Sequence, residues 1–169
     1  MKRLVVGTLS VCASLGLGAD HPRLVIDTGG HDSLVQSMTF SHDGRLLLSA
    51  GQDKVIRVWN VQTGRLSRTI RGQAGDDQQG MIYAIALSPD DRWLAVGGYL
   101  AGSSDADISA IRVHDFSTGE VRGLLRGHRR NVLALTFSRD GRYLASGSAD
   151  GSACLWSAEQ MTGFGCLPG

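Results

Sequence analysis

The residues best placed to do chemistry in this sequence form a set of four that occurs twice. In each set a histidine is followed by a serine, an aspartate and a tryptophan at identical spacing. The two sets, offset by 97 residues, are His31, Ser49, Asp53 and Trp59, and His128, Ser146, Asp150 and Trp156. Their chemistry is that of a hydrogen-bonded relay, in which the aspartate fixes the histidine, the histidine bonds the serine and the tryptophan donates its indole N–H. Each polar group can then be buried with a partner.

The elements that must position these residues are short β-strands arranged in a repeat of about 42 residues. Three turns of similar sequence occur at residues 41–45, 88–92 and 138–142, each between two apolar runs. A third run and a polar, glycine-containing linker follow, which predicts four short strands per unit. We expect units at about 31–72, 73–127 and 128–157, with residues 23–28 as a strand that closes a ring.

The composition supports a folded all-β domain and excludes several other classes. The 169 residues include 23 glycines and are 42% hydrophobic, which favours many tight turns and rules out a disordered chain. There are only three cysteines, so a disulfide scaffold is excluded. The net charge of +1 gives no general basic field, and we therefore expect no nucleic acid partner.

The repeated set resembles that of the WD-repeat β-propeller family, over about residues 23–157. The matching residues are the pairs Gly30-His31 and Gly127-His128 and the strand ends Trp59-Asn60 and Trp156-Ser157. The resemblance implies a partial β-propeller of about three four-stranded antiparallel blades. It also implies a non-catalytic scaffold that presents a loop-lined face to protein or peptide partners. The alternative is the N-terminal docking or sensor part of a larger protease- or kinase-type enzyme whose catalytic domain is absent from this chain.

The middle unit departs from the pattern. Val96 stands at the serine position, His114 at the tryptophan position and Gln78 where the loop histidine is expected. We expect apolar packing to hold this unit. No second ligand lies near His114 at metal-binding spacing, so it is interpreted as a core or interface histidine, and neither a metal nor a cofactor is expected.

The middle unit also carries extra residues in two loops that the relay places on one face. We expect these loops, with the arginines of the next unit, to form a partner-binding surface. The candidate residues are Asp76, Asp77, Tyr99, Leu100, Asp105, Asp107, Arg129 and Arg130. An equally weighted alternative is a solvated insertion without a partner.

The first nineteen residues have the layout of a secretory signal peptide. A basic start is followed by an uncharged apolar run and small residues, with cleavage expected after Gly18 or Ala19. The apolar run is too short for a membrane span. We therefore expect an exported protein without a stable span after cleavage. The alternatives are a cytoplasmic protein that retains an apolar N-terminus, or a lipid anchor through Cys12.

The C-terminal segment 158–169 loses the apolar alternation, and we expect an irregular tail in place of a fourth strand. This predicts a truncated fragment of a longer propeller. The alternative is assembly of two chains, because an open arc leaves blade flanks unburied and open to self-association. For Cys154 and Cys166 free thiols are favoured, although export would permit a disulfide.

Overall fold

The computed structural model describes residues 30–71, 79–100, 102 and 104–167, and these form three antiparallel sheets and one short helix. Each sheet consists of four consecutive strands in chain order. Sheet 1 contains β1 (Val35–Phe40), β2 (Leu46–Gly51), β3 (Val55–Asn60) and β4 (Leu66–Arg71). Sheet 2 contains β5 (Met81–Leu87), β6 (Trp93–Tyr99), β7 (Ile111–Asp115) and β8 (Val121–Leu125), with α1 (Asp105–Ile108) between β6 and β7. Sheet 3 contains β9 (Val132–Phe137), β10 (Tyr143–Ser148), β11 (Ala153–Ser157) and β12 (Thr162–Leu167).

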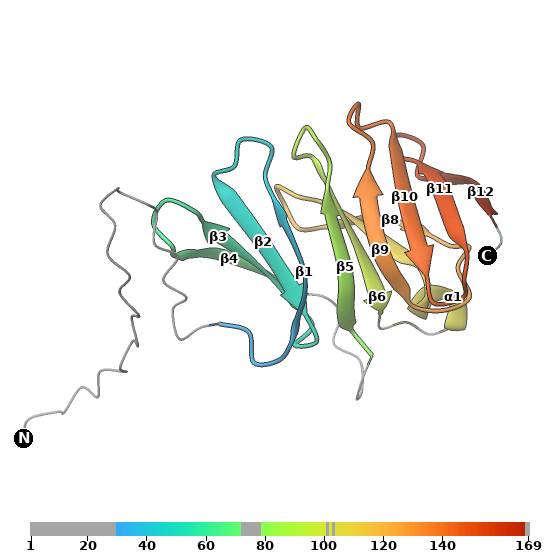
Figure 1. The fold of residues 1–169 in the computed structure, drawn as a ribbon, viewed down its shortest axis with the longest axis horizontal. Helices are drawn as coiled ribbons and strands as arrows, with labels where there is room; N and C mark the ends of the chain where they lie inside the picture. The colour runs from blue at the N-terminus through green and yellow to red at the C-terminus, as the bar shows by residue number, and fades with distance from the viewer. Residues whose placement is uncertain (1–29, 72–78, 101, 103, 168–169) are drawn as a thin grey trace, which may run out of the picture.

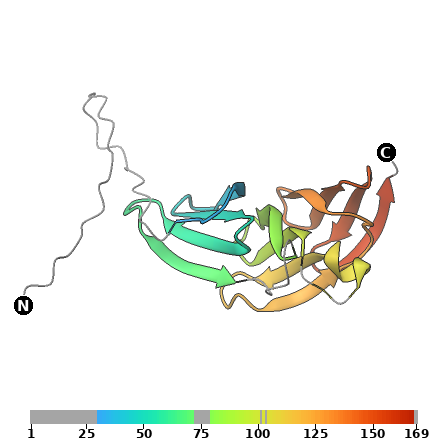
Figure 2. The same cartoon turned by 90° about the horizontal axis from the view of Figure 1, so that it is seen from below.

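The three sheets follow one another along an arc, from sheet 1 in blue and green to sheet 3 in orange and red (Figures 1 and 2). Their first strands, β1, β5 and β9, lie side by side on one side of the arc. Each later strand of a sheet lies farther out, so that β4, β8 and β12 are the outer edges. The arrangement confirms the expected class, an all-β partial propeller with three four-stranded antiparallel units.

Two apolar clusters fill the spaces between neighbouring sheets. The first joins sheet 1 to sheet 2, with Leu48, Ile56, Ile85 and Leu94 among its members. The second joins sheet 2 to sheet 3 and includes Trp156. Alternate residues of every strand point to opposite faces, so one strand can serve two clusters. The core therefore lies between the sheets.

The three repeated turns share one hydrogen-bond pattern. In the first turn the Ser41 hydroxyl donates to the Asp43 carboxylate at 2.7 Å and accepts from the Leu46 N–H at 2.9 Å. The other two turns repeat this pattern. In the third turn hydrogen bonds from the Ser138 hydroxyl and from Arg142 lower the pKa of Asp140 to about 2. The turn sequence thus fixes where the first strand of each sheet ends and the second begins.

The C-terminal segment is ordered, which corrects the expectation of an irregular tail from residue 158. Strand β12 pairs antiparallel with β11, and sheet 3 therefore has its fourth strand. This strand has no clear signal in the sequence, because every residue of β12 is exposed and the apolar alternation is lost. The strand forms on the free edge of β11, where backbone hydrogen bonds do not depend on side-chain type.

The expectation of free thiols at Cys154 and Cys166 is also wrong. Their sulfur atoms are bonded, and the two residues are directly opposite each other in the β11–β12 pair, with Cα atoms 4.0 Å apart. Once β12 is recognised as a strand, this pairing follows from its register.

Several of the predicted features lie outside the described residues. These are the expected signal peptide, Cys12, the strand at 23–28, Gln78, Asp76 and Asp77.

Candidate functional site

The first relay has the predicted connections. The Nδ1–H of His31, on the loop before β1, donates to the Asp53 carboxylate at 2.8 Å. The Nε2 atom of His31 accepts from the Ser49 hydroxyl at 2.7 Å, and that oxygen accepts the Trp59 indole N–H at 2.8 Å. Arg57 Nη1 also donates to Asp53 at 2.5 Å, and this nitrogen lies 2.9 Å from His31 Nδ1. The relay joins the loop, β2, the β2–β3 turn and β3 into one unit.

The second relay differs at its acidic end. The bonds from His128 to Ser146, 2.7 Å, and from Trp156 to Ser146, 2.8 Å, match the first relay. The Asp150 carboxylate lies 3.4 Å from His128 Nδ1, and the shorter path runs through Ser152. The Ser152 hydroxyl is 3.0 Å from His128 Nδ1 and donates to Asp150 at 2.6 Å. Ser152 is not among the residues predicted from the sequence, although its position two residues after Asp150 is a typical turn spacing.

Hydrogen bonding in both relays favours the charged form of the aspartate. Burial alone would raise the pKa of Asp53, but His31 and Arg57 outweigh it and lower that pKa. Burial likewise opposes ionisation of Asp150, but the Ser152 hydroxyl and the backbone N–H groups of Arg129 and Ser152 lower its pKa well below the ordinary value. Both carboxylates are therefore ionised at neutral pH.

These lowered pKa values predict acid sensitivity. A carboxyl that binds protons less readily in the folded chain stabilises the fold above its unfolded pKa, about 3.9, and this stability is lost as the pH falls through the folded pKa. Asp150→Asn is expected to lower stability at pH 7 and to flatten its decline below about pH 4. Urea midpoints measured from pH 2 to pH 7 test this, with Asp105→Asn on the exposed helix α1 as the control. Parallel curves for the wild-type and Asp150→Asn chains would contradict the assignment.

The middle sheet has no relay among its described residues, as its sequence predicts. Val96 is paired with Arg112 in the register that pairs Ser49 with Arg57. His114 is buried, and its Nδ1–H donates to the Gly119 carbonyl at 2.9 Å. Burial lowers the pKa of His114, so it is a neutral imidazole at pH 7. This agrees with its interpretation as a core histidine.

The loop between β6 and β7 holds several of the candidate partner-binding residues. Ser104 caps α1, and the Asp107 carboxylate accepts from Arg126 Nε and Nη2 at 2.9 and 2.7 Å. This ion pair ties the loop to the segment that leads into sheet 3. The expectation for Leu100 is wrong, because its side chain is 2% exposed and packs in the cluster between sheets 1 and 2.

The remaining candidates stay accessible to different degrees. Asp105, Arg129 and Arg130 are exposed, whereas Tyr99 is half-buried. The backbone N–H of Arg129 donates to Asp150 at 2.7 Å, which anchors this loop to the second relay. Helix α1 and the start of β9 lie at the same edge of the arc, the lower edge in Figure 1. We call Tyr99, Asp105, Asp107, Arg129 and Arg130 the loop face.

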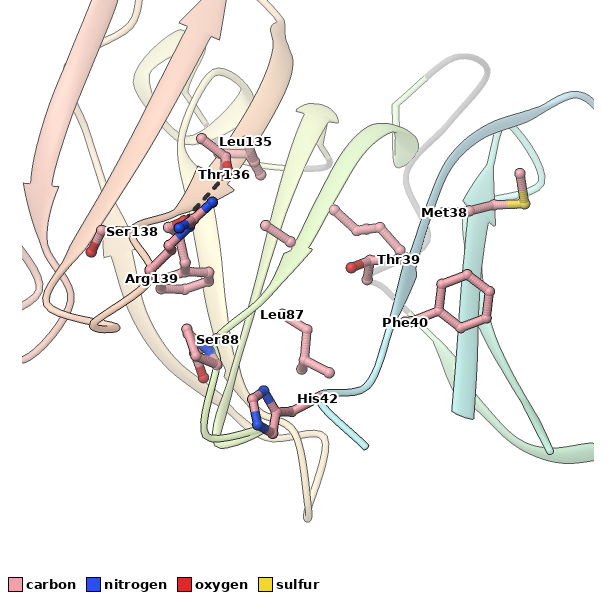
Figure 3. A pocket seen from close by; sticks show the side chains of 14 residues that line it. Met38, Thr39, Phe40, His42, Leu87, Ser88, Leu135, Thr136, Ser138 and Arg139 are labelled. Carbon is pink, nitrogen blue, oxygen red and sulfur yellow. Dashed lines mark hydrogen bonds between the residues drawn. The ribbon is translucent and has the colours of Figure 1, made fainter. Parts of the chain in front are cut away.

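A groove that the sequence did not predict lies at the opposite ends of β1, β5 and β9 (Figure 3). Its volume is about 600 Å³. The lining mixes apolar and polar side chains, with His42 and Arg139 at the turns. The groove becomes apparent only when the C-terminal ends of β1, β5 and β9 are placed side by side, and the sequence alone does not show this arrangement.

The described residues contain no group of three or more metal-binding side chains. Nor does the described part of the chain include a helix long and apolar enough to cross a membrane. The chemistry supported by the described side chains is that of structural relays and of charged loops open to solvent.

Comparison with known families agrees with the fold. Residues 23–60, 64–109 and 119–157 match the family described as WD domain, G-beta repeat. The chain belongs to the WD-repeat family. The first segment covers β1 to β3, the second β4 to β6 with α1, and the third β8 to β11. The first relay lies within the first segment and the second relay within the third.

WD-repeat relatives include subunits of protein complexes. The chain is 35% identical over 113 residues to the Target of rapamycin complex subunit wat1 of Schizosaccharomyces pombe, a match covering 66% of this chain and 32% of that protein. It is 29% identical over 135 residues to Autophagy-related protein 16 of Arabidopsis thaliana, covering 80% of this chain and 25% of that protein. The chain thus spans about a third or less of these relatives.

A solved structure of WD repeats gives the same fold. The crystal structure of RRP9 WD40 repeats superposes with a TM-score of 0.71 at 24% identity, covering 83% of this chain and 40% of that one. This likeness supports the propeller architecture of the three sheets.

Proposed function

We propose that this WD-repeat chain is a non-catalytic scaffold that presents the loop face to protein or peptide partners. The observation that carries the proposal is the Asp107–Arg126 ion pair, which fixes the α1 loop against the segment leading to sheet 3. An anchored loop beside exposed Arg129 and Arg130 offers a preorganised surface, which lowers the entropic cost of binding. The relatives named as complex subunits support the same class of function.

Charge reversal at the loop face tests this function. Partners captured by the wild-type chain are measured again, as purified proteins, against the double variant Arg129→Glu and Arg130→Glu. Interface arginines often contribute more than 1 kcal/mol each, so binding is expected to weaken by at least about tenfold. The control reverses two exposed arginines at the opposite edge, Arg45 and Arg65. Unchanged binding of every partner by the loop variant would rule out the loop face.

We further propose that the chain is exported. The signal-like layout of residues 1–19 supports this, and so does the Cys154–Cys166 bond, because disulfides persist mainly in oxidising compartments. Fractionation of cells that produce the full chain should place it outside the cytoplasm, and a variant without residues 1–19 should remain inside. Cytoplasmic location of both would refute export.

A further inference from the structure

The first observation concerns the face of sheet 1 that points away from sheet 2, which we call the open face of sheet 1. Strand register makes Val35 equivalent to Ile82 and Val132, since each lies at the start of the first strand of its sheet. Ile82 and Val132 are 2% and 0% exposed, whereas Val35 is 44% exposed. Met38 is 65% exposed where the equivalent Ile85 is 4% exposed. Met38 projects from β1 away from β5 (Figure 3).

The second observation concerns the face of sheet 3 that points away from sheet 2, which we call the open face of sheet 3. Leu155 is 42% exposed, whereas Val58 and Val113 at the same register position are 1% and 4% exposed. Leu167 on β12 is 74% exposed, against 4% for the equivalent Leu125 on β8. Both open faces therefore carry apolar residues at positions that a neighbouring sheet covers elsewhere in this chain.

The two open faces are the two halves of an interface that the chain already forms twice. Between sheets 1 and 2, Val58 and Ile85 belong to the same apolar cluster, and Leu155 and Met38 are the equivalent residues on the two open faces. Between sheets 2 and 3, a Cβ on Gly97 would lie 2.7 Å from Val132, which means that the absent side chain makes room for the valine. The open face of sheet 3 has Gly147 at this register position, and Val35 is the matching side chain on the open face of sheet 1.

We propose that two copies of this chain assemble head to tail into a closed ring of six sheets. The open face of sheet 3 in each copy packs on the open face of sheet 1 in the other. A second copy is the occupant because it supplies both faces at once and repeats the interfaces already present between neighbouring sheets. A closed ring then leaves no open face on either copy. This assembly does not depend on the loop face, so either proposal can fail alone.

Light scattering of the full chain after size exclusion tests the ring, with circular dichroism to verify folding. The expected mass is twice that of one chain and constant over a wide range of concentration. Met38→Glu and Leu155→Arg are each expected to give monomers, because each of the two interfaces between the copies would then bury an unpaired charge. Mixing the two variants should restore the dimer. One interface of the mixed dimer then pairs Glu with Arg, and the other interface carries neither substitution. If the first pair fails to fold, Val35→Glu and Leu167→Arg test the loss of the dimer at a second site on each open face.

The matched control is Val121→Glu, which places the same charge at an exposed apolar site on the outer strand β8 and should remain dimeric. A monomeric wild-type chain would overturn the proposal, and so would a mass that grows with concentration. Dimers that persist in all the face variants, or a mixture that stays monomeric, would overturn it as well.

Discussion

Trp156→Ala is expected to lower the free energy of unfolding by about 3–5 kcal/mol, the largest effect we predict for a single substitution. The indole is 3% exposed, and its N–H donates to the Ser146 hydroxyl. Its ring lies edge-on to His128, with centroids 6.1 Å apart. The substitution removes a large apolar volume and also leaves the Ser146–His128 pair without its donor. Urea unfolding followed by circular dichroism measures the loss.

His114→Ala is the matched control, because His114 occupies the same register position in sheet 2. It removes a smaller ring and one hydrogen bond to the Gly119 carbonyl, so the expected loss is about 1–3 kcal/mol. Trp59→Ala in the first relay should resemble Trp156→Ala. Equal losses at all three positions would show that the relays contribute nothing beyond ordinary burial.

Cys166→Ser is expected to cost about 3 kcal/mol, the second largest effect. The disulfide closes a loop between residues 12 apart, and bridges over loops of about this length stabilise by roughly that amount. All residues of β12 are exposed, so little apolar burial compensates for the lost bond. Hydrogen exchange of the 158–167 backbone should therefore become much faster in the variant. Adding a reductant to the wild-type chain should produce the same change.

Two controls separate the disulfide from other effects of reduction. Reductant should have no further effect on Cys166→Ser. In Cys12→Ser, which removes the one cysteine outside the disulfide, the effect of reductant should be fully retained. Slow exchange of β12 in the reduced wild-type chain would mean that backbone pairing alone holds the strand.

The sequence predicted the strands wherever apolar residues alternate and the turns carry their serine and aspartate. It also predicted which side chains of the first relay are connected, because spacing within a repeat determines which side chains meet, but it did not predict the bond from Arg57 to Asp53. It did not predict β12. There Gly163 lies against the Trp156 ring, where a Cβ would come within 3.0 Å of a ring atom, a tighter contact than most side chains make. In the sequence alone, a glycine that packs closely against a ring cannot be told from a glycine in a turn.

The candidate binding surface was predicted less well, for a different reason. Leu100 follows Tyr99 at the start of an insertion, and nothing local distinguishes a buried from an exposed loop leucine. The loop bends back so that the Leu100 N–H donates to the Ile108 carbonyl at 3.1 Å, which directs the side chain into the core. The Asp107–Arg126 ion pair likewise depends on this long-range path of the chain.

The strand order of each sheet has a consequence for how the protein forms. Every sheet is built from four strands that follow one another in the chain, each pairing with the next. All pairings within a sheet are therefore local hairpins, which close in microseconds. Only the packing of one sheet on another requires distant segments to meet. The first sheet can thus form as soon as residues 35–71 have been synthesised, and each later sheet then adds to a surface already in place.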